Sequence, residues 1–133
     1  MAVHPRLAAW EKRLHDILQQ VDAMLEEQYG REWPLHPARP PRGTTANAQY
    51  DGLFRVTASF SAGYGSELGR GYVFRTEMVT LAHVPAEIRE RIESSAIDSL
   101  CLLLDEEFPE QKLDVSRDGS IFKIHGNLNL GIL

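Results

Sequence analysis

Apolar and polar residues alternate most regularly between positions 53 and 60. The apolar members are Phe54, Val56, Ala58 and Phe60. A period of two is typical of a β-strand with one buried face, so we predict a strand over Leu53 to Phe60. A second strand is predicted over Tyr72 to Leu81, after a connection with glycines at 63, 65, 69 and 71. Apolar residues on both of its sides, among them Val73, Val79 and Leu81, favour a sheet covered on both faces and therefore oligomerisation.

Two longer segments repeat their apolar residues every three or four positions, which is the period of an amphipathic helix. The first is predicted from about Pro5 to Tyr29, because proline suits a helix start and Gly30 suits its end. Its apolar stripe includes Leu7, Trp10, Leu14, Ile17 and Val21. Two interpretations of this stripe stay open: the helix lies across its own sheet, or it also pairs with the same helix of another subunit. The second makes these five residues a candidate oligomer interface.

The second helix is predicted to begin at Val84-Pro85 and to end before Pro109. Both helices end on acidic residues, which the negative end of a helix disfavours. Those residues are Glu26, Glu27, Asp105, Glu106 and Glu107. We therefore expect a basic partner near these helix ends, either from the arginine-rich middle of the chain or from another subunit.

A short hairpin is predicted near the C-terminus, with Asp118-Gly119 as its tight turn. In that register Val115 faces Phe122. The predicted order is helix, strand, strand, helix, strand, strand. We expect an α+β fold, a two-layer sandwich of a four-stranded antiparallel sheet and two long helices. We treat residues 1–133 as a single α+β domain in which residues 31–50 form a connecting strap rich in proline and arginine.

The strap carries four prolines, which exclude a helix and favour an extended backbone packed on the surface. Trp33 and Leu35 are its expected anchors. Arginine side chains suit carboxylate or phosphate ligands, and here they occur in the strap and around the glycine-rich connection. The candidate anion-binding residues are Arg39, Arg42, Ser66, Arg70 and Arg75. The competing interpretation is that the arginines neutralise the acidic helix ends.

Charge is distributed unevenly along the 133 residues, whose formal net charge is −5. Residues 31–75 contain six arginines against three acids, whereas residues 76–111 contain nine acids against two arginines. An acidic protein without a known RNA- or DNA-binding pattern gives no reason to expect nucleic acid as a partner. No apolar run is long enough for a membrane span.

Motifs for catalysis are missing from the sequence. The five histidines lack metal-ligand spacing, the glycines fit no phosphate-loop pattern, and the single thiol, Cys101, is expected to be buried. We therefore expect no cofactor and no metal, and a cytoplasmic binding or assembly module rather than an enzyme, forming a homo-oligomer. The alternative is a small-ligand protein or enzyme that acts on an anionic substrate, a phosphate or a carboxylate, through the strap and the glycine-rich connection.

Overall fold

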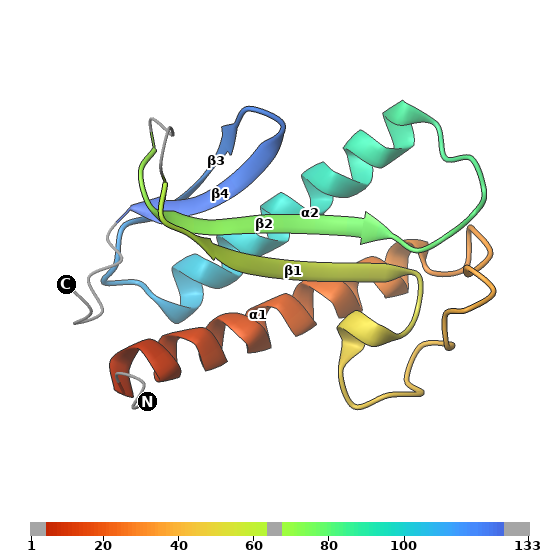
Figure 1. Cartoon of the computed structure of the whole chain (residues 1–133), viewed down its shortest axis with the longest axis horizontal. Helices are drawn as coiled ribbons and strands as arrows, with labels where there is room; N and C mark the ends of the chain where they lie inside the picture. Colours follow the sequence, from red (N-terminus) through yellow and green to blue (C-terminus); the bar gives the residue numbers. More distant parts are fainter. Residues whose placement is uncertain (1–4, 64–67, 127–133) are drawn as a thin grey trace.

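The computed structural model describes residues 5–63 and 68–126 and confirms the predicted order of elements (Figure 1). Helix α1 spans Pro5–Tyr29 and helix α2 spans Ala86–Glu107. The strands are β1 (Phe54–Ser61), β2 (Gly71–Met78), β3 (Leu113–Asp118) and β4 (Ile121–Gly126), and a short 3-10 helix, η1 (Ala48–Tyr50), precedes β1. None of the described helices combines the length and the apolar character that crossing a bilayer requires.

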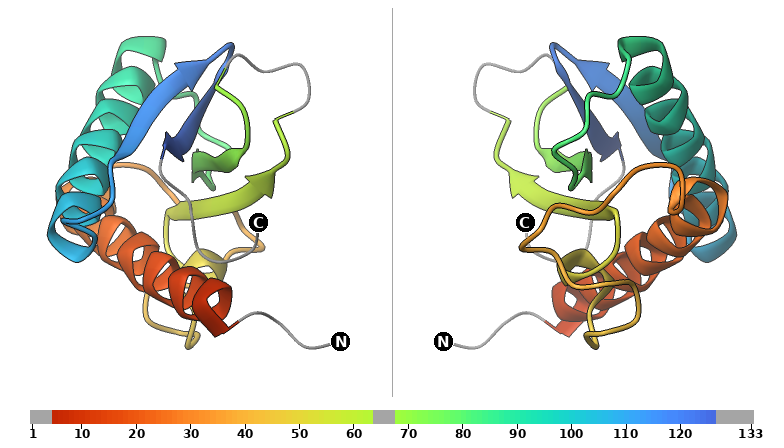
Figure 2. Two further views of the ribbon diagram at one scale, coloured as in Figure 1. Left: turned by 90° about the vertical axis from the view of Figure 1, so that its left-hand side faces the viewer. Right: turned by 90° about the vertical axis from the view of Figure 1, so that its right-hand side faces the viewer.

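The four strands form one antiparallel sheet in the order β1-β2-β4-β3, so β1 and β3 are its two edges. Both helices lie on the same side of this sheet (Figure 2). The fold is therefore the α+β, two-layer arrangement that the sequence predicts. Pairing between β2 and β4 is short, from Tyr72↔Ile124 to Phe74↔Phe122, and the β3–β4 hairpin then diverges from β2.

The apolar stripe of α1 belongs to the core of its own chain. Trp10, Leu14, Ile17 and Val21 are at most 4% exposed, and Leu7 packs against the same cluster from its margin. The ring of Trp10 lies 4.7 Å from that of Phe108 and thereby joins the two helices. Four of the five stripe residues are thus buried against the sheet and α2, and Leu7 is partly exposed. The structure thus matches the first interpretation of the stripe.

The register of the β3–β4 hairpin differs from the predicted one by two residues. Val115 pairs with Ile124, not with Phe122, and the two turn residues are Gly119 and Ser120. Gly119 has φ +66 whereas Ser120 has no positive φ, so the glycine occupies the first central position of the turn. That is the arrangement of a type II′ turn, whereas the prediction assumed Asp118-Gly119 at the centre.

The strap, residues 31–50, runs around the end of the sheet from α1 to β1 (Figure 1). Trp33 and Leu35 pack against the core, as predicted. The N–H of His36 donates to the carbonyl oxygen of Val79 at 2.9 Å. Strand β2 ends before this contact, at Met78, so Val79 and Leu81 lie outside the sheet and Leu81 is 73% exposed.

The sheet face away from the helices carries mainly polar side chains. Arg55 and Glu77 pair across β1 and β2, with Nη1 and Oε2 3.7 Å apart. Lys123 is buried on this face, where Nζ lies 3.1 Å from Asp118 Oδ2 and donates to the Gly69 carbonyl oxygen at 2.9 Å. Because Val79 and Leu81 are outside the strand, Val73 is the one apolar side chain that β2 presents on this face. The case for a second cover on the sheet is correspondingly weaker.

Candidate functional site

The backbone of β1 alternates between bonding to β2 and pointing toward the free edge of the sheet. The N–H of Val79 donates to the carbonyl oxygen of Leu53 at 2.7 Å, so Leu53 faces β2. The backbone N–H and carbonyl groups of Phe54 therefore point toward the free edge of the sheet. The N–H of Phe54 donates to Glu26 Oε1 at 3.2 Å, and its carbonyl oxygen accepts from Arg39 Nη2 at 2.9 Å. The first outward-facing residue of the edge is thus fully bonded within the chain.

The remaining outward-facing residues of β1 are Val56, Ala58 and Phe60, because the alternation continues along the strand. Within the described parts of the chain, no contact occupies their outward N–H and carbonyl groups. Exposure increases along this stretch from Val56, at 4%, to Phe60, at 55%. We call Val56–Phe60 the open half of the edge, and Leu53–Phe54 the covered half.

Arg39 closes the covered half from the strap. Its guanidinium is buried, and besides the bond to Phe54 it donates from Nε to the Gly52 carbonyl oxygen and from Nη2 to the Asp51 carbonyl oxygen, both at 2.9 Å. Three backbone acceptors, on Asp51, Gly52 and Phe54, are thus satisfied by one side chain. Such a group is costly to remove, because its acceptors would be left buried without partners.

Three carboxylates surround the strap arginines. Arg42 Nη1 lies 2.5 Å from Asp22 Oδ1 and 3.9 Å from Asp51 Oδ1, and both aspartates are 1% exposed. Asp51 Oδ2 accepts from the backbone N–H and the hydroxyl of Thr45, at 2.8 and 3.0 Å. The third carboxylate, Glu26, bonds the N–H groups of the covered half. Arg42 of the strap thus pairs with Asp22 inside α1, and Glu26 near the end of α1 bonds backbone N–H groups. At the end of α2, Glu107 pairs with Arg13 of α1.

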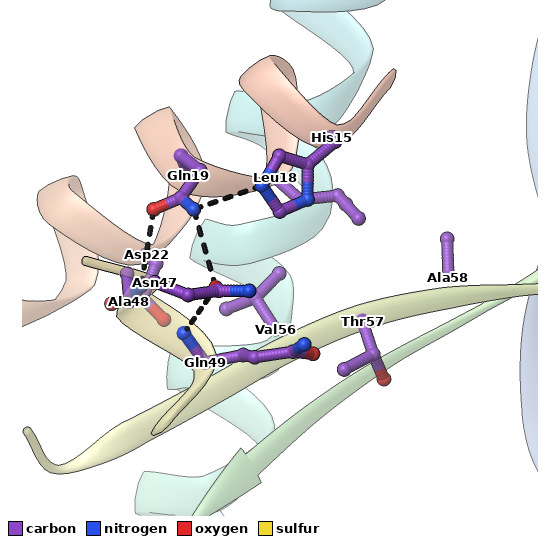
Figure 3. Close-up of a pocket in the computed structure, with 10 residues that line it drawn as sticks. All are labelled: His15, Leu18, Gln19, Asp22, Asn47, Ala48, Gln49, Val56, Thr57 and Ala58. Carbon is purple, nitrogen blue, oxygen red and sulfur yellow. Dashed lines mark hydrogen bonds between the residues drawn. The ribbon is translucent and has the colours of Figure 1, made fainter. Parts of the chain in front are cut away.

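A cavity of about 200 Å³ lies between α1, η1 and the start of the open half (Figure 3). Gln19 organises its helix side, since Nε2 lies 3.3 Å from Asn47 Oδ1 and Oε1 accepts from the Ala48 N–H at 3.3 Å. Asn47 Oδ1 also accepts from the Gln49 N–H at 3.1 Å and so caps η1. The residues around the cavity are His15, Leu18, Gln19, Asp22, Asn47, Ala48, Gln49, Val56, Thr57 and Ala58.

Asp22 contributes an unusual group to this cavity. Its Oδ2 is buried and has no hydrogen-bond partner, although Oδ1 is bonded to Arg42. Burial raises the pKa of Asp22 to about 7, against the lowering effect of Arg42 and with a further increase from Glu26. The cavity is therefore lined by a carboxyl group that changes charge near neutral pH and whose Oδ2 accepts no hydrogen bond.

The structure does not gather the sequence-predicted anion ligands at one place. Arg39 and Arg42 lie together in the strap, but their guanidinium groups are directed at acceptors of the same chain. Arg75 is exposed on the sheet face away from the helices, and Arg70 is half-buried just before β2. Ser66 lies outside the described residues. Arg39 bonds backbone carbonyl oxygens, and Arg42 pairs with Asp22 inside α1 and with Asp51, so the observed partners are not the helix-end acids Glu26 and Glu27 of the competing interpretation.

Sequence reasoning missed Asp22, Glu26, His15 and Gln19 as site residues. A signal for Asp22 was present, because it follows Leu18 by four positions and precedes Leu25 by three, within the apolar stripe of α1. A carboxylate at such a position is directed toward buried surroundings. Nothing in the sequence showed that the contacts of the strap with β1 would end at Phe54. Nor did it show that the outward backbone groups of Val56 would have no partner among the described residues.

Cys101 is half-buried, not fully buried as expected. Burial raises the pKa of its thiol, and Asp105, Asp98 and Asp114 raise it further. The thiol is therefore held in its protonated, less nucleophilic form. No group of three or more potential metal ligands occurs within residues 5–63 and 68–126.

The described residues thus form an α+β fold with a partly unpaired edge strand next to a polar cavity. The chain belongs to a protein family described as "Uncharacterised protein", whose sequence model matches residues 5–126. A relative from Borreliella burgdorferi, called "Uncharacterized protein", is 41% identical over 117 residues, which cover 88% of this chain and 91% of the relative. No solved structure matches the chain.

Proposed function

We propose that this protein is a cytoplasmic, non-enzymatic binding module that takes up an extended polypeptide segment by strand addition at the open half of β1. The observation that carries this proposal is the run of unbonded outward N–H and carbonyl groups at Val56, Ala58 and Phe60. An extended peptide pairs with such a row through its own backbone. A cytoplasmic location fits the single Cys101, which has no disulfide partner in the chain.

The composition of the open half supports this proposal. Edge strands are usually protected by charged side chains, by proline or by a covering loop. Residues 56–61 contain neither a charge nor a proline, although the strap covers the same edge two residues earlier. The opposite edge, β3, carries Asp114, Arg117 and Asp118. The difference favours β1 as a surface kept accessible for a partner strand.

A peptide is a better occupant than a second copy of this chain. A stable dimer generally buries roughly 1,200 to 2,000 Å² in total, with an apolar centre. Among the described residues the exposed large apolar side chains are Tyr50, Phe60, Leu81 and Leu102, and only Phe60 belongs to β1. A short polar edge with one exposed ring therefore suits a single added strand better than a permanent subunit contact.

The experiment uses a synthetic peptide, Ac-Thr-Val-Thr-Val-Thr-Val-Thr-NH2, titrated into the ¹⁵N-labelled full chain. Backbone pairing should move the amide resonances of Val56, Ala58 and Phe60 downfield, because these N–H groups acquire acceptors. The key variant is Ala58→Pro, which removes an outward N–H and leaves the ladder to β2 intact, as proline on an edge strand permits. It should abolish these shifts.

The matched control is Arg117→Pro on β3. Arg117 adjoins the bonded pair Asp118↔Ile121 that closes the hairpin, so its N–H also points away from the sheet. This variant should bind the peptide as the unaltered chain does. Saturable shifts confined to another surface, or no shifts at millimolar peptide, would overturn the proposal. So would a dimer in sedimentation that Ala58→Pro dissociates, because the edge would then belong to a second copy.

A further inference from the structure

The side chains of an added strand alternate between the two faces of the sheet. Those on the helix side would lie beside Val56 and Ala58, whose own side chains face the helices. That is where the cavity between α1, η1 and β1 opens (Figure 3). The cavity is therefore placed to receive one side chain of the bound segment. This step rests on the proposed function.

We propose that the cavity is a specificity pocket for a basic side chain, lysine or arginine, whose cationic group meets the unpartnered Oδ2 of Asp22. Asp22 is 1% exposed, and Oδ1 is already bonded to Arg42. A buried carboxylate oxygen without a donor is unfavourable, and a charge-assisted hydrogen bond from the ligand would satisfy it. A long side chain can reach this depth while its aliphatic stem packs on Leu18 and Ala48.

The charges around Asp22 allow a cation. From the strap, Arg42 and Arg39 act on Asp22, and from α1 the acid Glu26 does so. Asp51 Oδ1 lies 3.9 Å from the Arg42 nitrogen that also bonds Asp22, and His15 lines the cavity. With Asp22 ionised, three acids face two arginines, so a single added cation balances the cluster. An anionic side chain would increase the excess of negative charge.

The polar groups of the cavity are suited to orienting the guest. The amide of Asn47 and the ring of His15 both line the cavity on its helix side (Figure 3). Gln19 is fixed by its bonds to Asn47 and Ala48 and holds the wall in place.

The test compares four fluorescein-labelled peptides that differ only in the central residue of Thr-Val-Thr-X-Thr-Val-Thr, where X is lysine, arginine, norleucine or glutamate. This design reads the same residue order in both strand directions. Fluorescence anisotropy should give lysine or arginine at least about tenfold tighter binding than norleucine, equivalent to roughly 1.4 kcal/mol, and glutamate the weakest binding. Norleucine matches the lysine stem, so the comparison isolates the charge.

Asp22→Asn should reduce the preference for lysine over norleucine to about twofold or less. The matched control is Asp16→Asn, the same substitution at an exposed position of α1 outside the cavity, which should keep the preference. Affinity for the lysine peptide should also rise between pH 6 and pH 8, because Asp22 ionises in this range. His15→Asn should keep that rise if Asp22 is its source.

The outcomes separate the two proposals. Equal affinity of the lysine and norleucine peptides, with amide shifts at Val56 and Ala58 for both, would overturn the basic pocket and leave strand addition standing. A lysine preference that survives Asp22→Asn would also overturn it. If no peptide binds, strand addition itself fails, and the pocket fails with it.

Discussion

The two halves of the β1 edge have the same backbone geometry and opposite surroundings. At Phe54 the outward N–H and carbonyl oxygen are bonded to Glu26 and Arg39. At Val56, Ala58 and Phe60 the equivalent groups have no partner within the described residues. The chain evidently contains the means to seal this edge, since one arginine and one glutamate do so. This contrast within one strand is the basis of our proposal that a partner strand binds at the open half.

The strongest way to break the difference between the halves is to remove the seal with Arg39→Met. The loss leaves the carbonyl oxygens of Asp51, Gly52 and Phe54 without donors and the nearby carboxylates without a buried cation. We expect the free energy of unfolding to fall by about 3 to 5 kcal/mol, measured by urea denaturation. Arg75→Met, at an exposed position of β2, should change it by less than about 0.5 kcal/mol. If Arg39→Met and Arg75→Met lowered the free energy of unfolding equally, Arg39 would not be the residue that stabilises the covered half.

A second effect should come from pH. The pKa of Asp22 is raised to about 7 from an ordinary value of 3.8, so the folded chain holds a proton there that the unfolded chain releases. The free energy of unfolding should therefore decrease as pH rises from about 4 to 7, by at most about 4 kcal/mol. The pKa of Asp51 is lowered despite its burial, because hydrogen bonds from Thr45 and the charge of Arg42 favour the carboxylate, so its contribution is lost only below about pH 4.

Asp22→Asn should flatten this pH dependence between pH 4 and 7, as denaturation at several pH values would reveal. Asp16→Asn is again the control and should retain the slope. An Asp22→Asn chain with an undiminished slope would assign the effect to another group.

The covered half also depends on a close approach at Gly52. This residue has φ +73, and a Cβ atom there would lie 2.2 Å from Glu26 Oε1, the acceptor that bonds the start of β1. Gly52→Ala should lower the free energy of unfolding by about 1 to 3 kcal/mol and weaken the protection of the Phe54 amide. Gly43→Ala is a matched control, since Gly43 has φ +86 but no atom within 4 Å of such a Cβ. The excess of the first loss over the second measures the contact with Glu26.

The last prediction needs no substitution and concerns amide hydrogen exchange in the unaltered chain. Amides of Arg55, Thr57 and Ser59, which point toward β2, and the amide of Phe54 should be protected. The amide of Ala58, although within the same strand, should exchange at least about 100-fold faster than these, because it lacks an acceptor. Addition of a binding peptide should slow it selectively. Uniform protection along β1 without any peptide would mean that the edge is already paired.

The fold could be predicted from periodicity because each element signals itself locally. The predicted range of α1, about Pro5 to Tyr29, agrees with the structure, since Pro5 and Gly30 flank its apolar stripe. The hairpin register was wrong because one Asp-Gly pair fits two turns, with glycine as either central residue. The end of β2 was missed because a hydrogen bond from His36, distant in sequence, involves Val79 just beyond the strand.

The site was harder to predict because it depends on contacts between distant segments. Arg39 and Arg42 were selected as ligands of an external anion, and their proximity was foreseen. Their acceptors were not, because Asp22 and Glu26 lie in a helix and Asp51 in a turn, with nothing local to link them. Unbonded backbone groups such as those of Ala58 have no sequence signature at all, since they are defined by what the neighbouring strap leaves uncovered.

The strap has one further consequence for anything that docks on β1. Since the guanidinium of Arg39 already occupies the carbonyl oxygen of Phe54, a docked chain finds no pairing beyond Val56. Pairing with β1 would therefore span about five residues, or roughly 17 Å of extended chain, and would end at the side chain of Arg39. A ligand must terminate or turn away at this point. Under the proposed function, the protein would therefore accept a chain end or a bend, not the middle of an uninterrupted strand.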